Sequence, residues 1–369
     1  RDVRLTLQGD SLTDQSPLRA TPVGAATFAA VGPNRTVSVT WRVRVPLGAT
    51  PGRYDVVGRA TYRTERGQQS ARTVVSSTVV APITARLDPD HVTPAAGGTA
   101  TSTLTVTDNL DQPIGLSWAA GPAPNITLPG PSTTLLRPGA TATSAITVAA
   151  GEDALGVTTV PIHLRLQAAG QTAYGGALGL TVSVLLKDGR LYLTGNKVLT
   201  KAGAAWADYD LSFTAIPYQT GHSGQYAQAG WFFRAQDPTV ATGAWNWPGS
   251  GYLWLLSNSG GPGVLSKIVL VNGNIASSTT TTLPFPITAG TLYQLRTVVR
   301  GSTLQTYVNG TLVDTTTDST FPTGRVGFRE DGDESASFGQ LRVTAPDGQQ
   351  LFDADFTDPA DLGRFDGLS

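Results

Sequence analysis

Apolar and polar residues alternate repeatedly along the first half of the chain. In residues 37–45, valines and one tryptophan at the odd positions alternate with serine, threonine and arginine. The same period of two recurs in residues 102–106 and around Ile146 and Val148. A period of two places every second side chain on one face of a strand, so the pattern predicts half-buried strands. Prolines and glycines separate these runs and predict turns between the strands.

The second half of the chain adds hairpin signals to this pattern. Asn272-Gly273 follows an apolar run, and Asn309-Gly310 lies between two further runs. Asn-Gly supplies the two positive-φ positions of a type I′ turn and therefore predicts β-hairpins. The chain has only four lysines and four glutamates but 42 glycines and 24 prolines, so strong helix formers are scarce. We predict an all-β fold throughout.

The spacing of strands and turns predicts three domains. Residues 1–82 and 83–185 each have the size and short-strand pattern of an immunoglobulin-like β-sandwich. Residues 186–369 hold enough potential strands for a two-sheet, concanavalin-like jelly roll. The joins near Pro82 and Leu185 are short, so we expect the domains to stack as a semi-rigid stalk. Residues 351–369 either complete the jelly roll as its last strand or lead into a further domain.

Charge and composition argue against several functions. The formal net charge is −1 and no run of lysine or arginine occurs, which argues against nucleic-acid binding. The sequence contains no stretch of 18 apolar residues, so no membrane span is predicted. The chain contains no cysteine and hence no disulfide. It also contains no methionine, so Arg1 is not a translational start, and we expect a processed part of a longer polypeptide.

Tryptophan is concentrated in one part of the chain. Five of the seven tryptophans lie between residues 206 and 254, namely Trp206, Trp231, Trp245, Trp247 and Trp254. Indole rings stack on the apolar faces of sugars and offer an N–H donor, but they also fill cores. Trp245 and Trp247 lie in a Gly/Pro/Asn-rich loop, where they form either an exposed stacking platform or a lid folded back on the sandwich.

Residues 39–62, VTWRVRVPLGATPGRYDVVGRATY, resemble the alpha-galactosidase-associated immunoglobulin-like domain of bacterial glycosidases. Residues 83–185 are similar but more diverged. In that family the domain is usually a spacer between a catalytic domain and binding modules. The resemblance implies that both blocks are spacers.

The third block resembles the concanavalin/laminin-G-like jelly rolls appended to secreted bacterial glycoside hydrolases. The segments that carry the resemblance are AWADYDLSFTA, AGWFFRAQDP, GYLWLLS and GRVGFREDGDESASFGQLRVTAPDG, in residues 205–215, 229–238, 251–257 and 324–348. Such segments occur in domains associated with alpha-L-rhamnosidases, and family 66 carbohydrate-binding modules share the scaffold. The resemblance implies a sugar-binding module. Residues 239–250 depart from the pattern as a long insertion.

Two predicted strands supply the main candidates for sugar contacts. Arg234 and Gln236 share one strand face, with Asp237 directly after them, and their side chains can hydrogen-bond sugar hydroxyls. Tyr252 and Trp254 share one face of the next strand, where they would stack on a sugar. Two alternatives stay open: Arg234 pairs with an aspartate such as Asp237, or the second strand takes the opposite phase.

The acidic run of residues 330–334, EDGDE, supports three interpretations. Paired carboxylates would indicate a glycosidase, but Gly332 breaks the Glu-x-Asp-x-Glu alternation of laminarinase-type jelly rolls. Asp331 and Asp333 around a glycine turn could be calcium ligands. The run could also be a solvated turn. Within the family resemblance, Glu330 is expected to accept hydrogen bonds from a sugar.

The sequence therefore predicts a non-catalytic, carbohydrate-binding and spacer region of a secreted bacterial glycoside hydrolase. Its expected partners are a polysaccharide or glycan and a catalytic domain of the same polypeptide, with neither nucleic acid nor a membrane span involved. No cofactor is expected apart from a structural calcium ion. One alternative is that the jelly roll is itself a glycosidase or lyase. Another is that all three domains form a ligand-free structural or adhesin module.

Overall fold

Strands make up nearly all of the regular structure. The computed structural model describes residues 3–9, 19–32, 35–44, 47, 50–64, 66–79, 81–110, 112–130, 132–168, 170–236 and 249–367. Apart from the short helix α1 (Gly221–Gly224) and the 3₁₀ helix η1 (Pro359–Arg364), every element in these ranges is a strand. The predicted all-β class is confirmed. None of the described helices is long and apolar enough to cross a membrane.

The first module consists of two small sheets. Its strands are β1 (Val3–Gly9), β2 (Arg19–Val23), β3 (Thr27–Phe28), β4 (Thr40–Arg44), β5 (Gly52–Thr64) and β6 (Gly67–Val79). One sheet has the order β3-β1-β5-β6 and the other pairs β2 with β4. The long hairpin of β5 and β6 turns at Gly67, whose φ of 99° favours glycine.

The second module is a sandwich with a continuous apolar core. Its strands are β7 (Ile83–Asp88), β8 (His91–Val92), β9 (Thr99–Asp108), β10 (Ile114–Ala120), β11 (Ile126–Thr127), β12 (Ser132–Leu136), β13 (Thr141–Ala150), β14 (Gly156–Ala168) and β15 (Gln171–Val184). The two sheets have the orders β12-β10-β14-β15-β8 and β11-β13-β9-β7. Leu104, Val106, Ile146 and Val148 are buried between them, as the alternating pattern predicts.

The third module consists of two layers joined where β19 pairs with β20. The first layer, here called the groove sheet, contains β16 (Leu186–Lys187), β17 (Arg190–Thr194), β28 (Ser335–Thr344), β29 (Gln350–Ala354), β19 (Tyr209–Thr220), β24 (Tyr293–Arg300), β25 (Thr303–Val308) and β26 (Thr311–Thr317). The second layer, the tryptophan sheet, contains β18 (Lys197–Thr200), β27 (Arg325–Arg329), β20 (Tyr226–Ala235), β21 (Gly251–Ser257), β22 (Val264–Val271), β23 (Asn274–Thr282) and β30 (Phe365–Asp366). The two predicted Asn-Gly turns join β22 to β23 and β25 to β26.

The C-terminal segment belongs to the jelly roll. β29 pairs with β28, and β30 pairs with β18 on the opposite layer. Phe352, Phe356 and Phe365 are buried in the main core of the third module. This segment is therefore part of the sandwich, as one of the two interpretations of the sequence expected.

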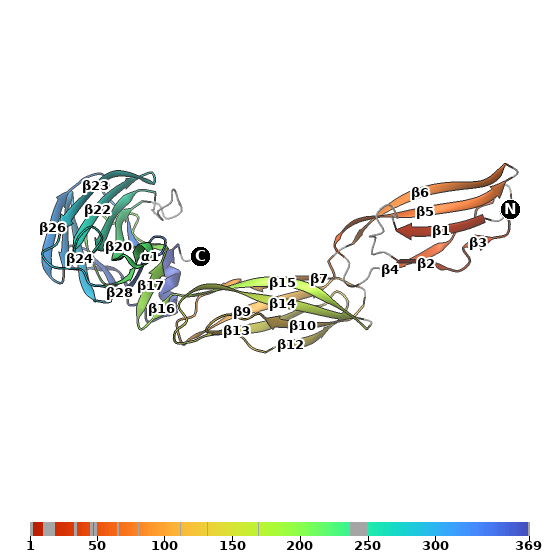
Figure 1. Cartoon of the computed structure of the whole chain (residues 1–369), viewed down its shortest axis with the longest axis horizontal. Helices are drawn as coiled ribbons and strands as arrows, with labels where there is room; N and C mark the ends of the chain where they lie inside the picture. Colours follow the sequence, from red (N-terminus) through yellow and green to blue (C-terminus); the bar gives the residue numbers. More distant parts are fainter. Residues whose placement is uncertain are drawn as a thin grey trace.

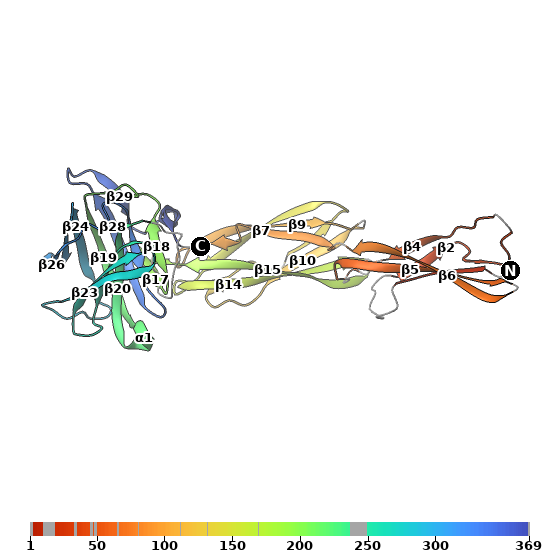
Figure 2. The same cartoon turned by 90° about the horizontal axis from the view of Figure 1, so that it is seen from above.

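The three modules lie in a row (Figures 1 and 2). At the join of the second and third modules, the Ala96 amide donates to the Leu186 carbonyl at 2.8 Å. Ala95 also packs against the core of the third module, and Lys187 pairs with Asp153 at 3.0 Å. The backbone bond and the apolar contact brace this join more than the exposed ion pair does, because surface ion pairs contribute little.

Candidate functional site

The aromatic residues predicted to contact sugar lie in the core instead. Tyr252 is 0% exposed and Trp254 is 1% exposed, both between the two layers. The indole N–H of Trp254 donates to Thr306 Oγ1 at 3.1 Å, and the Tyr252 hydroxyl donates to Asp318 at 2.6 Å. The prediction that these rings face an open cleft is wrong. The strand takes the opposite phase, and Leu253 faces the other side, in a second small apolar cluster.

Arg234 is also internal, with 2% of its surface exposed. Its guanidinium donates to three backbone carbonyls, those of Ala207, Gly301 and Phe321, at 2.7 to 3.2 Å. It also lies 3.5 Å from Asp208. A buried guanidinium needs such partners, so Arg234 ties loops together, and the prediction that it donates to sugar hydroxyls is wrong. The alternative of an Arg–Asp pair is closer to the structure, with Asp208 as the aspartate.

The other predicted contacts of the strand and loop fall into two groups. Gln236 is exposed, but its amide donates to the Arg234 and Thr323 carbonyls. Asp237, Trp245 and Trp247 lie outside the described residues, so their predicted roles stay predictions.

Glu330 is completely buried, where no soluble glycan can reach it, so its predicted sugar contact is wrong. One of its oxygens accepts from the Gly230 amide at 3.1 Å, and the other has no partner among the described residues. Burial raises the pKa of Glu330 well above its usual value, and the nearby Glu334 carboxylate raises it further. Surroundings of this kind favour the protonated form of the acid.

The turn after Glu330 uses its carboxylates internally. Asp331 lies 3.3 Å from the Arg329 guanidinium, and Asp333 accepts from the backbone amides of His222 and Ser223. Within the described ranges, no three His, Cys, Asp or Glu side chains come together as a metal site. Calcium binding by Asp331 and Asp333 stays a prediction.

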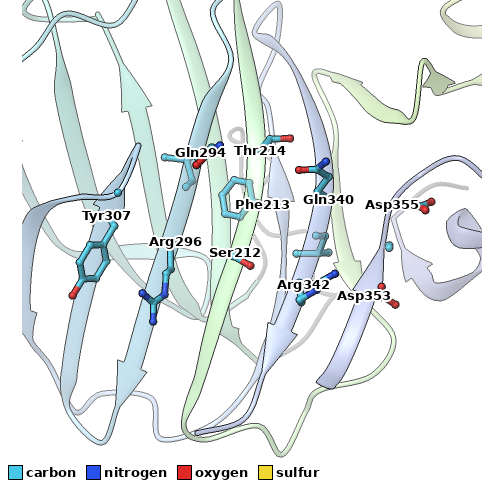
Figure 3. Close-up of a pocket in the computed structure, with 14 residues that line it drawn as sticks. Ser212, Phe213, Thr214, Gln294, Arg296, Tyr307, Gln340, Arg342, Asp353 and Asp355 are labelled. Atoms are coloured by element: carbon cyan, nitrogen blue, oxygen red, sulfur yellow. The ribbon is translucent and has the colours of Figure 1, made fainter. Parts of the chain in front are cut away.

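An open hollow of the third module lies on the outer face of the groove sheet. It has a volume of about 710 Å³ and is lined by residues of β19, β24, β25, β28 and β29, together with Gly310 and Asp355 (Figure 3). Binding pockets for small molecules have volumes of roughly 300–1,000 Å³. The hollow is therefore large enough for one or two sugar rings.

The register of the strands determines which side chains form the floor of this hollow, here called the groove. One cross-strand row contains Asp353 on β29, Arg342 on β28, Ser212 on β19, Arg296 on β24 and Tyr307 on β25. Neighbouring strands lie about 4.8 Å apart, so roughly 10 Å separates the backbones of the two arginines. The short side chain of Ser212 lies between them and leaves the space open (Figure 3).

The two arginines of the row have different surroundings. Arg296 forms an ion pair with Asp210, which also pairs with Arg300, and its guanidinium lies 5.4 Å from the centre of the Tyr307 ring. Arg342 is exposed and has no hydrogen bond or ion pair within the described part of the chain. Arg296 is therefore held in place, whereas Arg342 has its donors available.

Three further side chains around the groove have no internal partner among the described residues: Asp353, Gln294 and Gln340. Gln340 lies at a bulge of β28 with a φ of 53°. Such a bulge re-aims a side chain relative to its neighbours. Asp355 differs, because its carboxylate accepts from the Thr357 hydroxyl and amide, and these hydrogen bonds lower its pKa.

The outer face continues from the groove to a pair of tyrosines. Tyr218 follows Ser212 and Thr214 on the same face of β19, and its ring lies parallel to that of Tyr192 on β17, with centroids 6.1 Å apart. The Tyr218 hydroxyl lies 3.1 Å from Ser337 Oγ. Burial, followed by the interaction with Tyr218, raises the pKa of Tyr192 to about 12. Both rings are half-buried, so one surface of each is accessible.

The groove residues were missed in the sequence although a signal existed. Arg296 lies between Leu295 and Thr297, and Arg342 lies between Leu341 and Val343. Neighbouring side chains of a strand point to opposite faces, so an arginine between two inward-facing residues lies on the other face of the strand. Nothing in the sequence indicated that these two strands flank the same third strand.

The family described as the NPCBM-associated, NEW3 domain of alpha-galactosidase matches residues 19–63, which include β2, β4 and most of β5. The expected similarity to an alpha-galactosidase-associated domain is therefore confirmed for that segment. No curated protein sequence matches the chain.

Several solved structures resemble the chain weakly. A carbohydrate-binding module CBM66 from Bacillus subtilis is 17% identical, with 51% of this chain and 95% of that chain covered and a TM-score of 0.31. A SAP-like pentraxin from Limulus polyphemus is 16% identical, covering 43% and 72%, with a TM-score of 0.28. Sheep galectin-11 is 12% identical, covering 40% and 98%, with a TM-score of 0.27. These similarities are too weak to place a ligand in this chain.

Proposed function

We propose that the third module is a non-catalytic carbohydrate-binding module whose ligand lies in the groove over Ser212. The observation that carries this proposal is an open hollow bordered by polar side chains that have no partner within the described protein. Arg342 and Gln340 offer donors, and Asp353 and Gln294 offer acceptors. Sugar hydroxyls both donate and accept, so a site for them needs both kinds of group side by side. Tyr307 adds an aromatic surface for stacking.

The ligand is an extended chain in this proposal. β19 carries Ser212 and Tyr218 on one face six residues apart, or roughly 20 Å along the strand. A glycan that starts in the groove and follows β19 would reach the Tyr192–Tyr218 pair. Arg190 covers the strip between them, donating to Thr214 and Ser337 at 2.8 to 3.0 Å.

The placement of carboxylates supports binding over hydrolysis. The groove-lining carboxylates among the described residues, Asp353 and Asp355, both come from β29 or the residue directly after it, at one edge of the hollow. Glycoside hydrolysis needs two carboxylates that flank the scissile bond. Glu330, the acid expected from the enzymatic alternative, is buried elsewhere.

The first two modules are spacers in this proposal, and the chain is part of a secreted bacterial glycoside hydrolase that it holds near polysaccharide. The match of residues 19–63 to a domain of alpha-galactosidase supports this context.

The test is a glycan array with the full chain, followed by titration of the best oligosaccharide into the wild type and Arg342→Ala. We expect Arg342→Ala to weaken binding about tenfold, since it removes a charge-assisted donor. The control is Arg165→Ala, which removes an exposed arginine of the second module. Equal affinity of both variants, or an array without any bound glycan, would refute the proposal.

A further inference from the structure

Charge is unevenly divided along the chain. Residues 1–82 contain eleven arginines, no lysine and five acidic residues, a net charge of +6. The whole chain carries −1, so the other two modules together carry −7. The near-zero net charge of the whole chain is thus the sum of a basic first module and two modules that are acidic together. Sequence composition alone conceals this, because the arginines are scattered and form no run.

The fold gathers four of these arginines on one face. In the first module, β5 pairs with β1 on one side and with β6 on the other. This pairing places Arg4 opposite Thr61, Thr6 opposite Arg59, and Arg59 opposite Arg72. Arg63 lies four residues after Arg59 on the same side of β5. The arginine face is defined here as Arg4, Arg59, Arg63 and Arg72, all of which are exposed.

The four arginines are exposed, so this part of the face is open to solvent. The opposite side of the same sheet carries apolar residues, including Leu5, opposite Ala60, and Tyr62, opposite Gln69. The arginine side carries mostly threonine, serine and glutamine between the charges, and the buried Val57 lies next to Arg59 on the same side of β5. Side chains of one strand face alternate with those of the other, so all four guanidinium groups project to the same surface.

The four arginines form no ion pair with any described residue, and Arg59 and Arg72 are direct cross-strand neighbours. Like charges directly opposite each other destabilise a sheet. An external anion removes that repulsion. Guanidinium groups bind carboxylate, sulfate or phosphate through two parallel hydrogen bonds, so a face of arginines without lysine suits such groups.

We propose that the arginine face binds a polyanionic polysaccharide, one with carboxylate or sulfate groups along its chain. The charges extend along strands of thirteen residues, with Arg59 and Arg63 roughly 13 Å apart along β5. A linear, flexible polyanion can follow such a row. Double-stranded DNA is the other class of polyanion, but the four arginines come from three neighbouring strands of a four-stranded sheet, which is broader than the helix or two-stranded ribbon that enters a DNA groove. The site lies in a different module from the groove and does not depend on it.

The experiment measures retardation of the full chain in gels that contain polygalacturonate, neutral dextran or double-stranded DNA, at low and high salt. We expect retardation by polygalacturonate that disappears at high salt, and none by dextran. The variant Arg59→Gln/Arg72→Gln should weaken retardation about tenfold or more, since each basic residue near an anionic surface contributes roughly a factor of five.

Two further variants separate charge from folding. Arg137→Gln/Arg165→Gln removes two exposed charges from the second module and should leave retardation nearly unchanged, whereas Arg59→Lys/Arg72→Lys should restore part of what the glutamine variant loses. If the two glutamine variants weakened retardation equally, the proposal would be overturned, because retardation would then depend only on the net charge of the protein. Stronger retardation by DNA than by polygalacturonate would overturn it as well. Loss of glycan binding in Arg342→Ala affects only the groove, so failure of one proposal is distinguishable from failure of the other.

Discussion

The two layers of the third module differ in where their informative side chains point. The tryptophan sheet carries the large aromatics, and Trp231 and Trp254 are buried with their indole N–H groups bonded to Thr297 and Thr306 of the groove sheet. The groove sheet carries the unpaired polar groups on its outer face. The clustered tryptophans Trp231 and Trp254 therefore marked the core, whereas the accessible polar groups of the groove lie on the other sheet.

The largest expected effect comes from removing a large side chain from the core of the third module. Trp254→Ala should lower the free energy of unfolding by about 3–5 kcal/mol, because it leaves a cavity and an unpaired Thr306 hydroxyl. Chemical denaturation monitored by fluorescence checks this. Glycan affinity of the molecules that remain folded should be unchanged. If the variant were stable but no longer bound glycan, Trp254 would instead be a contact residue for the glycan.

The buried acid Glu330 predicts a pH effect on stability. Its pKa is raised in the folded state, so its contribution to stability is complete below the usual glutamate pKa of about 4.3 and is lost as pH rises through the folded-state pKa. Glu330→Gln should flatten this part of the profile of unfolding free energy against pH. The exposed Glu152→Gln serves as the control and should keep the wild-type slope. Identical profiles for the wild type and Glu330→Gln would show that burial does not perturb this carboxyl.

Filling the groove should abolish binding without unfolding the module. Ser212→Phe places a large ring between Arg296 and Arg342, where the side chain points outward. We expect a loss of glycan affinity of about tenfold or more, with the free energy of unfolding changed by less than about 1 kcal/mol. Calorimetric titration and thermal unfolding measure the two quantities. Retained affinity would mean that the ligand does not lie over Ser212.

The smallest expected effect concerns the tyrosine pair. Tyr218→Ala should weaken binding of long oligosaccharides by about threefold to tenfold, in line with one aromatic contact, and leave mono- and disaccharides unaffected. Titration of an oligosaccharide series of increasing length gives this comparison. A uniform loss for all lengths would argue that Tyr218 supports the groove itself, because Tyr192, Tyr218 and Ser337 are in contact.

Local patterns were sufficient for much of the fold. The alternation around Ile146 and Val148 and the Asn-Gly turns predicted strands and hairpins that the structure contains. The site was harder. Strand phase at Tyr252 and Trp254 could not be read from the sequence, because Leu253 on the other face is equally apolar and both sides of β21 are buried. When both faces of a strand are covered, alternation no longer separates inside from outside.

The sequence by itself determined the all-β class, the turns and which residues of a strand share a face, such as Arg59 and Arg63, because these follow from the period of a single strand. Only the tertiary structure decided which strands are neighbours. It brought Arg342 and Arg296 to either side of Ser212, Arg59 opposite Arg72, and Arg234 within reach of three distant carbonyls. Those pairings depend on contacts between residues far apart in the chain, whose energies no local pattern encodes.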